Sequence, residues 1–165
     1  MKNYIAAIAL VAAMPAQAGD LTLDINGVSQ HSKDTYWYQG KTHRYNESNL
    51  GLGLTYGVKK YVDVSAGFFE NSYYRTTVYA GFRLGPEFVF GDVVVSPGIQ
   101  AGYASGYVNT PVNSSSLRPV VLPNLRVAYR GVGVTVGYVP RVASGSVESV
   151  SVVTVQVNIK LGAKP

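Results

Sequence analysis

The sequence contains two histidines, His31 and His43, and a serine that could work with one of them, Ser72. A serine needs a base within hydrogen-bond reach to become a nucleophile or to deliver a proton, and histidine is the usual partner. Asn71, directly before the serine, could orient the imidazole through its amide. Spacing alone does not bring these residues together, because Asn-Ser at a corner between strands is also ordinary turn chemistry. The elements that carry them decide whether they meet.

From Leu21 onward, apolar residues alternate with polar or small ones, which is the period-two pattern of strands with one apolar face. Helical periodicity is not convincing anywhere in this part of the chain. The alternation predicts eight strands, at residues 21–31, 45–57, 61–70, 72–84, 88–103, 117–129, 131–139 and 149–161.

The polar side chains of these segments favour a barrel in a membrane. They are mostly Gly, Thr, Asn and Gln, with a few charges, among which Asp63, Arg75 and Arg83 are predicted to face the barrel interior. A soluble surface usually carries more charged residues than this, whereas a membrane barrel has an apolar outer face and a polar lumen. We therefore predict an all-β, eight-stranded, antiparallel up-and-down transmembrane β-barrel. A soluble, exported lipocalin-like barrel with its apolar faces inward around a ligand is the alternative.

The first residues have the composition of a secretory signal peptide. A short basic start with Lys2 precedes an apolar run at residues 5–14 and the sequence A-Q-A at 16–18. A membrane-spanning helix needs about 20 apolar residues, so this run is too short to be one. We expect residues 1–18 to be a signal peptide and residues 19–165 to be one β-barrel domain in the outer membrane of a Gram-negative bacterium.

Composition excludes several classes of function. The chain has no cysteine, which rules out zinc-thiolate sites and thiol catalysis. Its formal charge of +5 is spread along the chain and does not form the basic patch of a nucleic-acid-binding protein. We expect membrane lipids as partners, no nucleic acid, no metal or other cofactor, and a monomeric protein.

The lengths of the connections predict which strand ends share a rim. Outer-membrane barrels have short periplasmic turns and longer outer loops. Starting from a periplasmic N-terminus, the outer connections are residues 32–44, 70–71, 104–117 and 141–148, and the inner turns are 57–60, 85–87 and 130–131.

This topology brings the end of the first strand and the corner at residues 70–72 to the same outer rim. His31, Asn71 and Ser72 could therefore converge there. Strict alternation, however, places His31 on the outward face with Leu21. Its ring reaches the barrel mouth only if the strand contains a bulge or if His31 lies above the hydrocarbon.

Five short motifs follow one another in the mature chain: His31, K-T-H-R-Y-N-E at 41–47, F-E-N-S at 69–72, R-P-V-V-L-P at 118–123 and Y-V-P at 138–140. In order and spacing they resemble the lipid A palmitoyltransferase family of Gram-negative outer membranes. The resemblance implies an eight-stranded acyltransferase barrel that transfers an acyl chain from a phospholipid to lipid A, with the chain held inside the barrel. The family's catalytic histidine, aspartate and serine correspond to His31, Asn71 and Ser72.

The asparagine at the aspartate position departs from the family pattern. An amide can orient an imidazole but cannot stabilise it as a cation, and in serine proteases the equivalent change costs about 10⁴ in rate. The resemblance therefore predicts that Asn71→Asp raises activity.

Two other features concern access to the barrel interior. Pro123 and Pro140 match prolines that flank a lateral lipid gate in the family, because proline interrupts the hydrogen-bond ladder between strands. Asn26 and Asn49 stand where the prolines of a second gate would be. Arg83 occupies the position of a small residue that sets the depth of the acyl chain, where its guanidinium would obstruct a long chain and pair with Asp63 or Asp92.

Besides the soluble lipocalin-like binder, two functions remain open for a membrane barrel. One is a lipid A acyltransferase, or a relative that acts on another acyl substrate, with Ser72 and His31 as the reacting pair. The other is a non-catalytic outer-membrane barrel on the same scaffold that binds lipid or masks the surface, since a fold does not fix a function. Asn71 and Arg83 favour the second.

Overall fold

The computed structural model describes residues 19–111, 117–141 and 150–161, and these residues form strands, turns and loops. No helix in these three ranges is long and apolar enough to cross a membrane. The strands are β1 (Leu21–His31), β2 (Thr35–Tyr38), β3 (Lys41–Arg44), β4 (Ser48–Lys59), β5 (Val62–Glu70), β6 (Thr76–Leu84), β7 (Phe88–Phe90), β8 (Val93–Ala104), β9 (Arg118–Tyr129), β10 (Val132–Val139) and β11 (Val152–Leu161). The predicted signal peptide lies outside the described residues.

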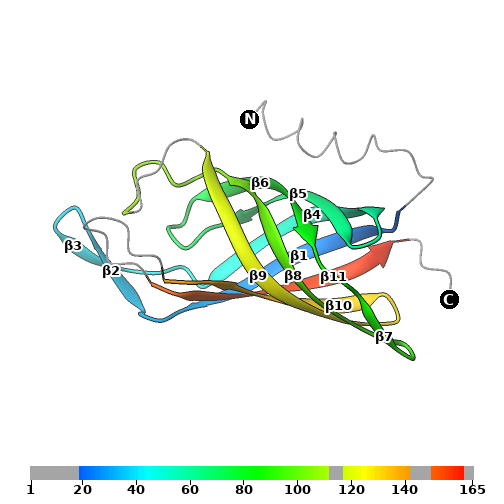
Figure 1. Ribbon diagram of the computed structural model, residues 1–165. Coiled ribbons are helices and arrows are strands. Elements are labelled where there is room, and N and C mark those ends of the chain that lie inside the picture. Colours follow the sequence, from blue (N-terminus) through cyan, green and yellow to red (C-terminus); the bar gives the residue numbers. More distant parts are fainter. Residues whose placement is uncertain (1–18, 112–116, 142–149, 162–165) are drawn as a thin grey trace.

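Eight of these strands form a closed antiparallel barrel (Figure 1). Around the barrel the order is β1, β4, β5, β6, β8, β9, β10 and β11, and β11 pairs with β1 to close it. Apart from this closing pair, strands that are neighbours in the barrel also follow one another along the chain. The predicted up-and-down, eight-stranded barrel is confirmed.

The two ends of the barrel differ in their connections. At one end, which we call the turn end, two-residue turns join three pairs of strands. Residues 60–61 join β4 to β5, residues 91–92 join β7 to β8, and residues 130–131 join β9 to β10. At the other end, the loop end, β1 leads into the separate β2–β3 hairpin, which projects beyond the barrel (Figure 1). β1 begins and β11 ends at the turn end.

The predicted inner turn at residues 85–87 is wrong. Both β6 and β7 pair antiparallel with β8, so residues 85–87 are a break in one long strand, and the chain reverses at Gly91 and Asp92. Pro86 has no N–H to donate to the ladder, which explains the break. Gly91 has a φ of 63°, a left-handed conformation that glycine adopts without steric cost.

The apolar face of the barrel points outward. Along β9 and β10, alternate side chains are apolar and exposed, whereas the residues between them point inward. The outward set is Val121, Leu125, Val127, Tyr129, Val132, Val134, Val136 and Tyr138. This is the arrangement of a transmembrane barrel. It does not fit the lipocalin-like alternative, which required the apolar faces inside.

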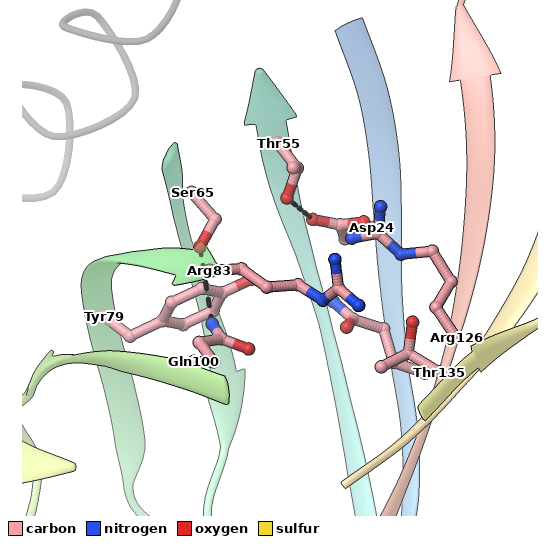
Figure 2. A pocket seen from close by; sticks show the side chains of 9 residues that line it. Asp24, Thr55, Ser65, Tyr79, Arg83, Gln100, Arg126 and Thr135 are labelled. Carbon is pink, nitrogen blue, oxygen red and sulfur yellow. Dashed lines mark hydrogen bonds between the residues drawn. The ribbon is translucent and has the colours of Figure 1, made fainter. Parts of the chain in front are cut away.

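Polar side chains fill the turn-end half of the lumen (Figure 2). Asp24 is almost completely buried and accepts hydrogen bonds from Thr55 Oγ1 at 2.5 Å and Asn158 Nδ2 at 2.8 Å. Asn158 in turn accepts from Thr135 Oγ1 at 2.5 Å. These bonds link four neighbouring strands, β4, β1, β11 and β10, along the inner wall of the barrel.

Arg83 is buried beside this group. Its guanidinium donates to Asn124 Oδ1 at 2.9 Å and to the carbonyl and hydroxyl oxygens of Ser96 at 2.7 and 2.8 Å. Asp63 lies 3.6 Å from Arg83 and 3.5 Å from Arg126, so one carboxylate serves two guanidinium groups. Arg83 and Asp63 thus lie in the barrel interior, where the sequence pattern placed them.

Arg75 does not lie in the interior. It is exposed, in the corner between β5 and β6, because β6 starts at Thr76 and not at residue 72. The residues before Thr76 form a turn that is held together by the side chain of Asn71. Extending the strand pattern back through this turn gave Arg75 the wrong environment.

Candidate active site

A β-bulge in β1 turns His31 into the mouth of the barrel. The register of β1 shifts between Asn26 and Val28 against both β4 and β11. Beyond the shift, Ser29 and His31 are buried while Val28 and Gln30 are exposed. An extra residue in one strand reverses the faces of all residues after it. Strict alternation would place the His31 side chain on the outward face, and the bulge turns it inward instead.

His31 meets Ser72 at the loop end. The imidazole Nε2 lies 2.8 Å from Ser72 Oγ, which is in the turn between β5 and β6. If the hydroxyl donates to Nε2, the neutral ring carries its proton on Nδ1. Tyr45 stacks on the imidazole with a centroid distance of 4.2 Å and an interplanar angle of 2°, which fixes the plane of the ring. The two residues form a base–hydroxyl pair with the geometry that nucleophile activation needs.

Asn71 is next to this pair but its side chain points away from the imidazole. Its Nδ2 donates to Thr77 Oγ1 and to the carbonyl of Gly106, both at 3.0 Å. Its Oδ1 accepts from the backbone N–H groups of Tyr73 and Arg75 at 2.9 and 3.2 Å. An asparagine amide has two donor hydrogens and two acceptor sites, so these four bonds use them all. Asn71 shapes the turn that presents Ser72.

Glu47 is the carboxylate nearest to His31. Its Oε1 accepts a hydrogen bond from the backbone N–H of His31 at 3.2 Å and lies 3.6 Å from the imidazole Nδ1. Reasoning from the sequence did not assign this residue to the site. The signal that could have found it is its place at the end of the K-T-H-R-Y-N-E run, directly before β4.

Aromatic rings cover the pair on the side of the β2–β3 hairpin. Tyr36 lies 4.8 Å from Tyr45 and 5.1 Å from Tyr73 between ring centroids, and it stacks on His43 at 5.3 Å. Burial raises the pKa of the Tyr73 phenol and that of Tyr36. Both phenols are therefore neutral at physiological pH, and they add no charge beside the imidazole. His43 belongs to this cover and does not contact Ser72.

The ladder between β9 and β10 stops halfway along the barrel. Pairing runs from Tyr129 and Val132 at the turn end only as far as Asn124 and Gly137. From Pro123 toward the loop end, β9 stays paired with β8 but not with β10. Pro140 directly follows β10. Pro123 and Pro140 therefore lie beside a stretch in which the described residues of β9 and β10 are not paired with each other.

β1 and β4 have no comparable unpaired stretch. Asn26 pairs with Gly51 and Val28 pairs with Ser48, and the backbone N–H of Ser29 donates to the carbonyl of Glu47 at 2.9 Å. The ladder there is interrupted only by the bulge.

The lumen below the mouth is narrow. Tyr79 reaches from β6 toward Gly53 and Gly67, where any side chain would collide with its hydroxyl. Tyr79, Arg83 and Gln100 line a small cavity in the polar half of the lumen (Figure 2), which has room for about one water molecule. Among the described residues, no group of three or more His, Cys, Asp or Glu side chains could hold a metal ion.

No protein-family model matches the sequence, and no curated protein sequence is similar to it. The structure is similar to solved transmembrane barrels. A structure described as "De novo design of transmembrane beta-barrels" has a TM-score of 0.59 and 17% sequence identity, covering 90% of this chain and all (100%) of that one. The solution NMR structure of the de novo designed TMB2.3 has a TM-score of 0.50 and 22% identity, covering 90% and 99% of the two chains.

A crystal structure of the outer membrane enzyme PagL also matches, at a TM-score of 0.41 and 13% identity, covering 85% of this chain and 98% of that chain. A likeness this distant does not inform on activity. Together with the outward apolar face, the comparisons with the designed barrels assign this chain the fold of a transmembrane β-barrel.

Proposed function

We propose that this protein is an outer-membrane acyltransferase that moves an acyl chain from a phospholipid to lipid A. The observation that carries the proposal is the 2.8 Å contact between His31 Nε2 and Ser72 Oγ at the loop end of a membrane barrel. By the resemblance described above, both residues correspond to catalytic positions of the lipid A palmitoyltransferase family. A bulge in β1 is needed to bring them together, so the contact does not follow from a regular barrel.

The chemistry would proceed in two balanced steps. Ser72 Oγ attacks the donor ester carbonyl as its proton moves to His31 Nε2. The bond from the carbonyl carbon to the glycerol oxygen breaks, and that oxygen takes the proton from the imidazolium. An acceptor hydroxyl of lipid A then attacks the acyl-serine, its proton passing through His31 back to Ser72.

The unpaired stretch between β9 and β10 supports lateral access for a lipid. Beyond Pro123 no ladder hydrogen bonds between these strands would have to break for an acyl chain to enter from the bilayer. Inside, the acyl chain would occupy the loop-end half of the lumen. It would end above Tyr79 and Arg83, because the turn-end half is filled by side chains.

The test is mass spectrometry of lipid A from a Gram-negative host that lacks its own lipid A acyltransferase. Expression of the wild-type protein, confirmed in the outer membrane, should add the mass of one acyl chain, and Ser72→Ala should abolish the addition. Ser48→Ala is the matched control, because Ser48 is exposed at the start of β4 at the same end of the barrel. Retained acylation in Ser72→Ala would rule out this site.

A non-catalytic lipid-binding or surface-masking barrel is the second candidate. The observation that favours it is the packing of Arg83, Asp63 and Arg126 across the lumen, which leaves little space for a long acyl chain. In the same experiment, unchanged lipid A together with a folded barrel, detected by its heat-dependent gel mobility, would favour this candidate.

A further inference from the structure

We infer that Glu47 is the positioning residue of His31 and supplies the carboxylate that the family resemblance places at Asn71. The inference deepens the proposed function and rests on it, since a positioning residue needs a reaction to serve. It is carried by the contacts of one short segment, residues 45–47, with both members of the pair.

Each residue of this segment holds a different part of the site. Tyr45 stacks on the face of the His31 ring. The backbone N–H of Asn46 donates to the carbonyl of Ser72 at 2.9 Å, so the segment also fixes the serine. Glu47 approaches the edge of the imidazole that faces away from Ser72. The segment therefore contacts both the imidazole and the serine.

Glu47 is held in place through both its backbone and its side chain. The carbonyl of Glu47 accepts from the N–H of Ser29 at 2.9 Å, which ties the residue to β1 beyond the bulge. Its Oε1 accepts from the N–H of His31 at 3.2 Å. The same oxygen is 3.6 Å from Nδ1, a few tenths of an ångström beyond a hydrogen bond. Because the Glu47 side chain is half exposed, a small rotation closes this distance, and catalytic contacts commonly tighten when substrate binds.

The Nδ1 atom needs this partner. It is buried and has no hydrogen-bond partner within the described ranges of the chain. The groups that face the ring are Tyr45 on its face, Ser72 at Nε2 and Val152 opposite it on β11. Glu47 is the charged group that acts on it, and the neighbouring Glu70 is held by Asn46 Nδ2 at 2.9 Å.

A carboxylate at Nδ1 would do two things for the reaction. It holds the proton on Nδ1, so that Nε2 stays free to accept from Ser72. It also stabilises the imidazolium that forms when the serine proton moves. Asn71 can do neither, because its amide is fully used in the turn.

The experiment measures acyl-transfer rate against pH for the wild type, Glu47→Gln and Glu47→Asp in detergent micelles. Glu47→Gln should lower the rate by about 10²–10⁴-fold, as loss of the carboxylate does in a serine triad. The acid limb of its pH profile should also move to lower pH, because the imidazolium loses a stabilising charge. Glu47→Asp should restore part of the rate. Asp34→Asn, which removes an exposed carboxylate of the same rim, should leave both unchanged.

Failure of the inference and failure of the proposed function give different results. If the wild type is active and Ser72→Ala is not, an unchanged rate and pH profile in Glu47→Gln overturns the inference alone. If the wild type is inactive, the NMR titration of the His31 ring nitrogens decides the matter without any turnover. A lower titration midpoint in Glu47→Gln then supports the positioning contact, and an unchanged midpoint overturns it.

Discussion

Two buried groups of the lumen, Arg83 in the turn-end half and His31 at the mouth, differ in how fully their polar atoms are paired. In the turn-end half, Arg83 makes three hydrogen bonds and an ion pair, and Asp24 is buried with two strong donors. At the mouth, His31 has one nitrogen on a hydroxyl and the other without a hydrogen-bond partner, near a half-exposed carboxylate. Polar groups whose hydrogen-bonding atoms are all paired stabilise a fold, whereas a group with an unpaired atom is available for chemistry. The comparison attributes a structural role to the contacts of Arg83 and is consistent with the proposed reaction at His31.

The largest loss of stability should come from removing the contacts of Arg83 in the turn-end half of the lumen. Arg83→Met removes one of the two guanidinium groups that share Asp63 and leaves Ser96 and Asn124 without their donor. Asp63 keeps Arg126 as its partner, so the cost comes mainly from the buried acceptors of Ser96 and Asn124, at about 1–3 kcal/mol for each group left unsatisfied. Urea unfolding in detergent micelles measures this loss. Arg130→Met is the control, because Arg130 is exposed. Equal stability of the two variants would contradict a structural role for the lumen network.

The next effect concerns the turn that presents Ser72. The hydrogen bonds of Asn71 predict that Asn71→Asp lowers activity, the opposite of what the family resemblance predicts. A carboxylate cannot donate to the Gly106 carbonyl and would face that oxygen with a negative charge. A buried group left unsatisfied costs about 1–3 kcal/mol. Unfolding and acylation assays measure both consequences. Thr77→Val removes the bond from Asn71 Nδ2 and the bond to the Ser105 carbonyl but introduces no buried negative charge, so it should cost less. Increased activity in Asn71→Asp would restore the family's assignment.

A smaller effect should follow from loosening the mouth without touching its polar atoms. Tyr45→Leu removes the ring that stacks on His31, and an aromatic pair contributes about 0.5–1.5 kcal/mol beyond its buried area. Acyl transfer should fall by a few-fold to about tenfold. Tyr45→Phe keeps the ring and should retain the rate if stacking is what matters. Equal losses in both variants would instead implicate the hydroxyl.

The smallest effect should come from an ion pair outside both regions. Asp92 and Arg130 lie 2.8 Å apart at the turn end, and both are more than half exposed. Exposed pairs contribute about 0–1 kcal/mol and are screened by salt. Asp92→Asn should therefore change the unfolding midpoint little, and less at high salt than at low salt. A loss as large as that of Arg83→Met would show that charge pairing, and not burial in the lumen, sets stability.

Much of the barrel could be predicted because period-two alternation reports directly on which face meets lipid. β1 begins and ends where the pattern placed it, and the other seven barrel strands overlap their predicted segments. The β2–β3 hairpin and the β6–β7 break were missed. A hairpin beyond the membrane carries no apolar alternation, and Gly85-Pro86-Glu87 has the composition of a turn whether the chain reverses there or not.

The site was only partly predictable, for geometric reasons. The topology correctly brought His31 and Ser72 to one rim, but no residue pattern marks the bulge at Gly27 that turns the imidazole inward. The partners of Asn71 are set by a turn and by the Gly106 loop, which lie far apart in sequence. Glu47 meets His31 because β1 and β4 are paired, a contact that side-chain type alone cannot identify.

The hydrogen bond between Asp24 and Asn158 has a consequence for how the chain assembles. It joins residues 134 positions apart, on the first and the last strand of the barrel. Contacts of such long sequence separation form late and slowly. An assembling chain therefore has an open seam between β1 and β11, where Asp24 lacks its Asn158 donor until β11 arrives. Pairing of β11 with β1 and formation of the hydrogen bond from Asn158 to Asp24 should occur as one cooperative event at the end of folding.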